Sequence, residues 1–390
     1  MPVPRAHPVR LSNLFDWARG CAVERARGRV LAHEELITRF THQRERTRRL
    51  AAMSQLHERS VMSIVNVGTR LARTVDELEK VSAQNRKDEA AHVRLLNMIK
   101  HKHLPDTATI ALAFKRLCSE ASERESQEID QSLDEFFRSN IGINTLLDHS
   151  LAIHEHPEGG PLCGVVRDDV DVRSLVLDVC ELGRELCERN FPHIPDAPDH
   201  KIAVHCKRER LEFGADVNVD AVPSPTVVGV PHLIHAAMLE VVKNAMRATA
   251  EYAIAHNIEM QPLHVAIAES DEEVCVLFED RGGGIPRRTA ERLLFGYCRS
   301  SAEVPHPPEL EESGRHASFS GADSPIAGFG VGLPYARAQI QYFGGDLKVL
   351  SVPGLGTSAC FHLPRDPDQA VEEIPVDPPW RDDLAQGRGR

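Results

Sequence analysis

A polar stripe follows one side of the helix predicted for HAAMLEVVKNAMRATAE, residues 235–251. Four side chains recur there at i, i+3, i+4 and i+7, which a helix brings to one face: Glu240, Lys243, Asn244 and Arg247. Together they offer a carboxylate, an amide oxygen and two positive charges. The alternative is a solvated face, whose neighbour pairs contribute only about 0.2–0.5 kcal/mol each. Asn244 argues against that alternative, because asparagine is a poor residue for the middle of a helix.

A second segment, VCVLFEDRGGGIP, predicts a strand that ends in an acid. The acid is Asp280, and three glycines follow at 282–284. Three glycines are a costly backbone unless something must approach it closely. A simple turn after a strand would not need the acid.

A third segment, SPIAGFGVGLPYARAQIQYFGG, carries alternate glycines into a predicted helix. Such a loop offers unpaired amides and the positive end of a helix dipole to phosphates. It is not the dinucleotide-binding fingerprint, since Leu333 stands where the third glycine would be and no strand directly precedes the loop. It is not a P-loop either, because no Gly-Lys-Ser/Thr follows. The glycines are Gly328, Gly330 and Gly332.

A predicted hairpin, GDLKVLSVPGLGTSACFHL, adds a Gly-Thr turn at Thr357. The four elements in this order resemble the Bergerat-type nucleotide site of histidine kinases, Hsp90-type chaperones, gyrase-type ATPases and mitochondrial protein kinases. EVVKNAMRAT, EDRGGGIP, AGFGVGLP and QYFGGDL resemble the mitochondrial 2-oxoacid dehydrogenase kinases, which comprise pyruvate dehydrogenase kinase and branched-chain 2-oxoacid dehydrogenase kinase. SLDEFFRSNIGINTLLDHSLAI and IKHKHLPDTATIALAF extend the resemblance over residues 25–364.

The resemblance implies ATP and Mg²⁺ as cofactors and a role for each site residue. Asn244 is expected to hold Mg²⁺ and Glu240 to orient or deprotonate the acceptor serine. Asp280 is expected to accept the adenine amino group, with Thr357 beside the base. The remaining cofactor-binding residues are expected to be Lys243 and Arg247 as positive charges, Gly282 and Gly284 along the base, Ser300 and Ser301 in the lid, and Gly328, Phe329, Gly330, Val331, Gly332 and Leu333 at the phosphates.

One departure concerns a histidine. Pyruvate dehydrogenase kinases usually have a histidine four residues before the catalytic glutamate, but that place is Ala236 here. His235 lies five residues before Glu240, about 140° round a helix. A bulge or a late helix start would bring it to Glu240, and we therefore include His235 as a catalytic candidate. A histidine at the helix start, without a catalytic role, is the alternative.

The elements that position these residues indicate two domains, with an α + α/β fold. Residues 25–190 are expected to form an N-terminal helical bundle of the four-helix type, which the resemblance implies is the regulatory and lipoyl-docking domain. Short β-prone runs alternate with helices in 191–364, which predicts an α/β sandwich, and the resemblance implies that it is a Bergerat-type ATP-binding kinase domain. Residues 365–390 are acidic and rich in proline, and an extended tail is expected. The Arg-rich, acid-poor residues 1–24 suggest a mitochondrial transit segment.

Composition excludes several classes of function. The formal charge of -12 argues against nucleic acid as the main partner, and no run approaches the 18 apolar residues of a membrane span. The cysteines are odd in number and contain no C-x-x-C pair, which by spacing predicts neither a zinc site nor a disulfide framework but reduced thiols. They are Cys21, Cys118, Cys163, Cys180, Cys187, Cys206, Cys275, Cys298 and Cys360.

By resemblance, the chain is expected to be a serine kinase of the mitochondrial matrix. It would transfer the γ-phosphate of ATP to the E1 α subunit of a 2-oxoacid dehydrogenase complex and so inactivate it, with the pyruvate complex favoured over the branched-chain one. Expected partners are that E1 α subunit, the E2 lipoyl domain and a second copy in a homodimer. Two alternatives remain open: a histidine autokinase, and a non-catalytic ATP-binding scaffold.

Overall fold

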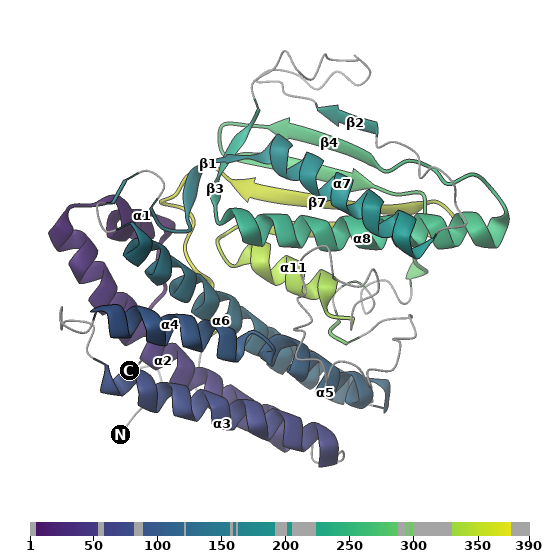
Figure 1. Cartoon of the computed structure of the whole chain (residues 1–390). Helices are drawn as coiled ribbons and strands as arrows, with labels where there is room; N and C mark the ends of the chain where they lie inside the picture. The colour runs from purple at the N-terminus through teal and green to yellow at the C-terminus, as the bar shows by residue number, and fades with distance from the viewer. Residues whose placement is uncertain are drawn as a thin grey trace, which may run out of the picture.

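The structure, a computed structural model, contains two layered domains joined along one helix (Figure 1). It describes residues 5–53, 58–81, 89–120, 122–156, 159–160, 163–191, 201–204, 224–287, 294, 296–298 and 330–375. Within these residues, none of the helices combines the length and apolar character that crossing a membrane requires.

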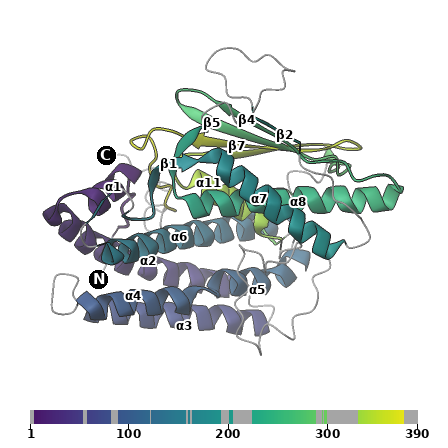
Figure 2. The same ribbon diagram turned by 45° about the horizontal axis from the view of Figure 1, so that its top comes forward.

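The N-terminal domain is a bundle of long helices that lie side by side (Figure 2). Helices α4 and α5 are separated only by Leu104 and Pro105, and together they occupy the place of one bundle helix. Proline lacks the backbone N–H that a continuous helix would need, which explains the break. The helices are α1 (Leu11–Arg19), α2 (Ala22–Met53), α3 (Glu58–Lys80), α4 (Glu89–His103), α5 (Asp106–Glu120) and α6 (Glu123–Glu155).

Helix α6 connects the bundle to the second domain. It begins at a capping box, in which the Ser122 backbone N–H donates to Glu125 Oε2 at 2.9 Å and the Glu125 N–H donates to Ser122 Oγ at 3.4 Å. Leu133, Phe136 and Phe137 are almost completely buried. They belong to a core that includes residues of both the bundle and α11 (Gly332–Gln341).

Both ends of the described chain are part of this core, which differs from prediction. Leu11 and Leu14 of α1 are fully buried, so the transit segment predicted for 1–24 contains residues that the fold requires. The predicted extended tail is also packed near its start. Val371 forms a β-bridge with Arg10, and the side chain of Glu372 is buried against the bundle.

The second domain is a sheet covered by helices on one face (Figure 1). Its strand order is β2-β4-β5-β7-β6, and every neighbouring pair is antiparallel except β2 and β4. This confirms the predicted α + α/β fold class. The strands are β2 (Lys201–Val204), β4 (His264–Glu269), β5 (Glu273–Glu279), β6 (Asp346–Val352) and β7 (Gly356–Pro364).

Helix α7 (Val172–Asn190) belongs to this second domain. Val176 and Val179 pack with α8 (Pro231–His256) in the core beneath the sheet. The predicted bundle, 25–190, therefore extends too far, because an apolar helical stripe does not reveal which domain covers it. Strand β1 (Arg167–Asp171) directly precedes α7, and strand β3 (Thr226–Gly229) comes after it in the chain; the two strands pair in a separate two-stranded sheet. Strand β1 was not predicted.

Candidate nucleotide site

A cavity of about 290 Å³ opens between α8, the sheet and the N-terminus of α11. Its size suits a small organic ligand. The sequence predicted ten of the residues that line it, from four separate segments. They are Glu240, Asn244, Arg247, Asp280, Gly282, Gly284, Gly330, Gly332, Leu333 and Thr357.

Asp280 lies directly after β5, and the backbone fixes its carboxylate. Its Oδ1 accepts hydrogen bonds from the N–H of Gly282 at 2.8 Å and of Thr357 at 3.1 Å. In the described part of the chain its Oδ2 has no hydrogen-bond partner. Burial raises the pKa of Asp280, and the two backbone donors oppose that rise. The geometry leaves one oriented acceptor for a ligand N–H.

The glycines after Asp280 allow the chain to turn beside α8. A Cβ on Gly282 would lie 2.7 Å from the backbone carbon of Ala248. Gly284 has a φ of 65°, in the left-handed region, and a Cβ there would collide with the carbonyl oxygen of Val352. The close approach in the structure is to the protein's own backbone, and contact of these glycines with a bound base stays a prediction.

Thr357, at the start of β7, completes this end of the cavity. Its backbone carbonyl accepts a hydrogen bond from the N–H of Asp280 at 2.9 Å. Its hydroxyl lies 2.9 Å from that of Ser351, whose Oγ accepts from the N–H of Ile285 at 2.8 Å. These hydrogen bonds join β6, β7 and the glycine segment at the end of the cavity where the adenine base is predicted to lie.

Glu240 and Lys243 form an ion pair on α8, one turn apart. Both residues are buried, with 9% and 2% of their surface exposed, and only Glu240 lines the cavity. Burial raises the pKa of Glu240, while the charge and hydrogen bond of Lys243 lower it. Glu240 also lies against the start of α11, where a Cβ on Gly332 would collide with its carboxylate. A buried carboxylate with a raised pKa is suited to act as a general base.

Asn244 and Arg247 lie further along the same face of α8. Asn244 is exposed on the cavity wall, and among the described residues its amide has no partner. Its oxygen is therefore available for a hard metal ion. The guanidinium of Arg247 donates from Nε to Glu251 at 2.7 Å.

Several predicted residues lie elsewhere. His235 does not line the cavity; burial lowers its pKa, and Asp178 of α7 is the charged group that opposes this. Among the described residues, no contact between His235 and Glu240 supports the predicted catalytic role of His235. Val331 is buried in the bundle core. Ser300, Ser301, Gly328 and Phe329 lie outside the described residues.

The cavity also has a lining that the sequence analysis missed. Period-two alternation places Phe278 and Ala359 on the same sheet face as Asp280 and Thr357, and this signal could have identified them. The remaining lining residues, most of them apolar, come from α8, from the segment after Asp280, from α11 and from β6, with Leu294 in addition. They are Val241, Ala245, Ala248, Glu251, Ile285, Leu294, Pro334 and Val349.

Comparisons with known families divide the chain into two matching parts. The family described as "Mitochondrial branched-chain alpha-ketoacid dehydrogenase kinase" matches residues 8–169, which include the helical bundle. The family described as "Histidine kinase-, DNA gyrase B-, and HSP90-like ATPase" matches residues 229–367, which contain the cavity.

Curated relatives extend across both parts. The chain is 33% identical over 281 residues to the probable mitochondrial pyruvate dehydrogenase (acetyl-transferring) kinase of Caenorhabditis elegans, covering 71% of this chain and 63% of that protein. It is 30% identical to the mitochondrial pyruvate dehydrogenase kinase of Arabidopsis thaliana, over 71% of this chain and 69% of that protein. It is also 30% identical to the Drosophila melanogaster kinase, over 85% of this chain and 73% of that protein. With its helical bundle and Bergerat-type ATPase domain, the chain belongs to the mitochondrial 2-oxoacid dehydrogenase kinase family.

Proposed function

We propose that the chain is an ATP-dependent protein-serine kinase that phosphorylates the E1 α subunit of the mitochondrial pyruvate dehydrogenase complex and so inactivates it. The observation that carries the proposal is one cavity that joins Glu240 and Asn244 of α8, Asp280 after β5 and the N-terminus of α11. Curated relatives named as pyruvate dehydrogenase kinases support the substrate class.

Different residues of the cavity are proposed to bind the adenine, the phosphates and the metal ion. The Oδ2 of Asp280 accepts the adenine amino group, and the apolar side chains of Phe278 and Ala359 exclude water around the base. Amides at the start of α11, beside Gly332, and the dipole of that helix bind the phosphates. The amide oxygen of Asn244 would hold Mg²⁺, which neutralises phosphate charge when bound.

Glu240 is the group that handles the proton. Its carboxylate, held by Lys243, accepts the hydroxyl proton of the substrate serine as the serine oxygen attacks the γ-phosphorus of ATP, the bond from that phosphorus to the β-γ bridging oxygen breaks and ADP leaves. Because Glu240 lies against Gly332, its carboxylate is at the end of the cavity where the phosphates are proposed to lie.

The partners and the compartment form part of the same proposal. The bundle is proposed to dock the E2 lipoyl domain, two copies to associate through the second domain, and the kinase to act in the mitochondrial matrix.

The test is phosphate transfer from labelled Mg-ATP to purified pyruvate and branched-chain dehydrogenase complexes. Serine label on E1 α of the pyruvate complex with loss of its activity is expected. Glu240→Gln should reduce the rate by about 100-fold or more, whereas Glu259→Gln, on an exposed loop residue, should not.

Other outcomes assign other functions. Label on the branched-chain complex alone would change the substrate, and acid-labile label on a histidine of the chain would favour an autokinase. ATP binding without label on any protein would favour a scaffold.

A further inference from the structure

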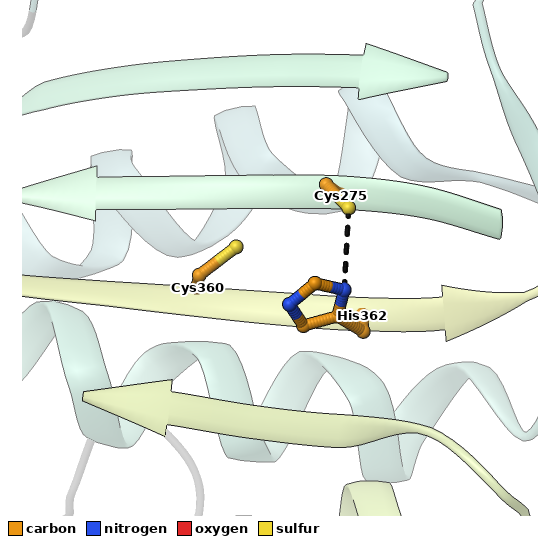
Figure 3. A group of neighbouring side chains, drawn as sticks. All are labelled: Cys275, Cys360 and His362. Carbon is orange, nitrogen blue, oxygen red and sulfur yellow. Dashed lines mark hydrogen bonds between the residues drawn. The ribbon is translucent and has the colours of Figure 1, made fainter. Parts of the chain in front are cut away.

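The open face of the sheet carries a cluster of metal-binding side chains that lies away from the nucleotide cavity. Cys275 of β5 and Cys360 and His362 of β7 have ligand atoms within 4.8 Å of one another. Figure 3 views these side chains with the covering helices behind the sheet. Glu273 of β5 adds a carboxylate to the group, which we call the outer-face cluster.

Strand register explains how residues far apart in sequence meet here. Cys275 pairs directly with His362, and Cys360 pairs with Leu277, one diagonal step away. All four cluster residues alternate with buried ones along their strands, so they share the face opposite the helices. The spacing of Cys275 and Cys360 in the sequence resembles no zinc motif, so the sequence alone predicts no zinc site there.

Three of the distances between ligand atoms match those of a tetrahedral zinc site, and Cys360 Sγ lies within 4.8 Å of the ligand atoms of Cys275 and His362. His362 Nδ1 lies 3.4 Å from Cys275 Sγ and 3.2 Å from Glu273 Oε1, and Cys275 Sγ lies 3.4 Å from that same oxygen. Around zinc, with bonds of about 2.0–2.3 Å, tetrahedral geometry separates neighbouring ligand atoms by about 3.3–3.8 Å. Small side-chain movements would therefore admit an ion between them.

We infer that the outer-face cluster is a zinc-binding site, with Cys275, Cys360, His362 and Glu273 as its ligands. Two thiolates and an imidazole favour zinc over magnesium or calcium, which prefer oxygen ligands. Four protein ligands make the site closed and structural. Both thiols release their protons to solvent when the metal binds.

The site would join the two central strands of the sheet. β5 continues into Asp280, and β7 begins at the turn that holds Thr357. A metal bound across β5 and β7 stabilises the folded state by mass action, since the unfolded chain does not hold the four ligands together. The inference does not depend on the phosphotransfer function, because none of the four side chains lines the nucleotide cavity.

The test uses cobalt(II), a spectroscopic substitute for zinc, with the full-length chain stripped of metal and kept reduced by a non-thiol reductant. One tightly bound equivalent is expected, with a thiolate-to-cobalt charge-transfer band and the intense visible bands of tetrahedral cobalt. Zinc should displace both sets of bands. It should also raise the Tm of the protein.

Matched variants locate the site. Cys275→Ser and Cys360→Ser should each weaken zinc binding more than the roughly 10- to 100-fold caused by losing a group behind a ligand. Cys21→Ser, at an exposed cysteine outside the cluster, should bind as the unaltered chain does. Glu273→Gln, at a residue with 44% of its side chain exposed, should change the visible bands while the charge-transfer band remains.

Two results would overturn the inference. One is the absence of a thiolate band in the unaltered chain. The other is the same band and affinity in the Cys275→Ser, Cys360→Ser double variant, which would place the metal on other thiols.

Discussion

The carboxylate of Asp280 has one oxygen fixed by two backbone amides and one available to a ligand. Asp280→Asn must direct its amide oxygen to those amides, which turns its NH₂ toward the ligand. Donor would then face donor, and ATP affinity should fall about 10- to 100-fold. Calorimetric titration with ATP checks this, with Asp271→Asn, in the exposed turn before β5, as the control. Unchanged affinity in Asp280→Asn would remove the aspartate from the site.

The ion pair of Glu240 and Lys243 predicts a pH dependence. Glu240 acts as a base in its ionised form, and burial raises its pKa, so phosphotransfer should be lost as pH falls through a value above that of an ordinary glutamate. Lys243 opposes the rise. Lys243→Met should therefore move the acidic limb of the kcat/KM profile to higher pH, while Lys80→Met, at an exposed helix end, should leave it in place. An unmoved limb in Lys243→Met would contradict the role of Glu240.

At the scale of elements, the approach of α11 to α8 decides whether phosphates can bind. A Cβ at 332 would collide with the carboxylate of Glu240, so that carboxylate or the start of α11 would have to move. Gly332→Ala should therefore displace the groups at this end of the cavity and weaken ATP binding by at least about tenfold, since one lost hydrogen bond to a charged group already costs about 1.5–3 kcal/mol.

The control for this substitution is Gly68→Ala in α3. A Cβ at that position meets only a methyl group of Thr47 at an ordinary 3.5 Å. Alanine there should leave nucleotide binding intact and favour the helix. Equal nucleotide binding by Gly332→Ala and the unaltered chain would show that the close approach is not needed.

The elements could largely be predicted from sequence, because their signals are local. β5 alternates buried and partly exposed residues from Glu273 to Glu279, and α8 begins with Pro231 and is followed by a cap residue, Asn257, in the left-handed conformation. Which elements pack together is not a local property. The stripe of α7 would suit the bundle as well as the sheet, and only the assembled fold assigns it to α8.

At the scale of the whole molecule, a buried charge network joins segments near the two ends of the described chain to the bundle and to Tyr342, which follows α11. Arg39 of α2 donates to Glu372 at 2.6 Å and to Glu35 at 3.0 Å, and it also contacts the hydroxyl of Tyr342. Glu372→Gln should lower the free energy of unfolding by about 3 kcal/mol, because it leaves the buried guanidinium of Arg39 with Glu35 as its one acidic partner among the described residues.

Its neighbour provides the control. Glu373 pairs with Arg138 at the surface, with 61% of its side chain exposed, so Glu373→Gln should change stability by less than about 1 kcal/mol. Urea unfolding measures both variants. Equal midpoints for the two would mean that the network does not hold the ends of the chain.

Long-range contacts also explain what the sequence analysis could not predict. The burial of Glu372 depends on Arg39, more than 300 positions earlier, and the outer-face cluster depends on the register of β5 with β7. Residues that line the cavity could be predicted to lie together because Glu240, Asn244, Asp280 and Gly332 each lie in a short segment with its own pattern.

The central claim is that the cavity between α8, β5 and α11 holds Mg-ATP. The most direct measurement is ATP affinity with and without Mg²⁺, for the unaltered chain and for Asn244→Ala, with Asn97→Ala on the exposed face of α4 as the control. The account predicts that Mg²⁺ tightens ATP binding in the unaltered chain and in Asn97→Ala, and that Asn244→Ala loses this effect. An equal effect of Mg²⁺ in all three proteins, or no ATP binding by the unaltered chain, would contradict it.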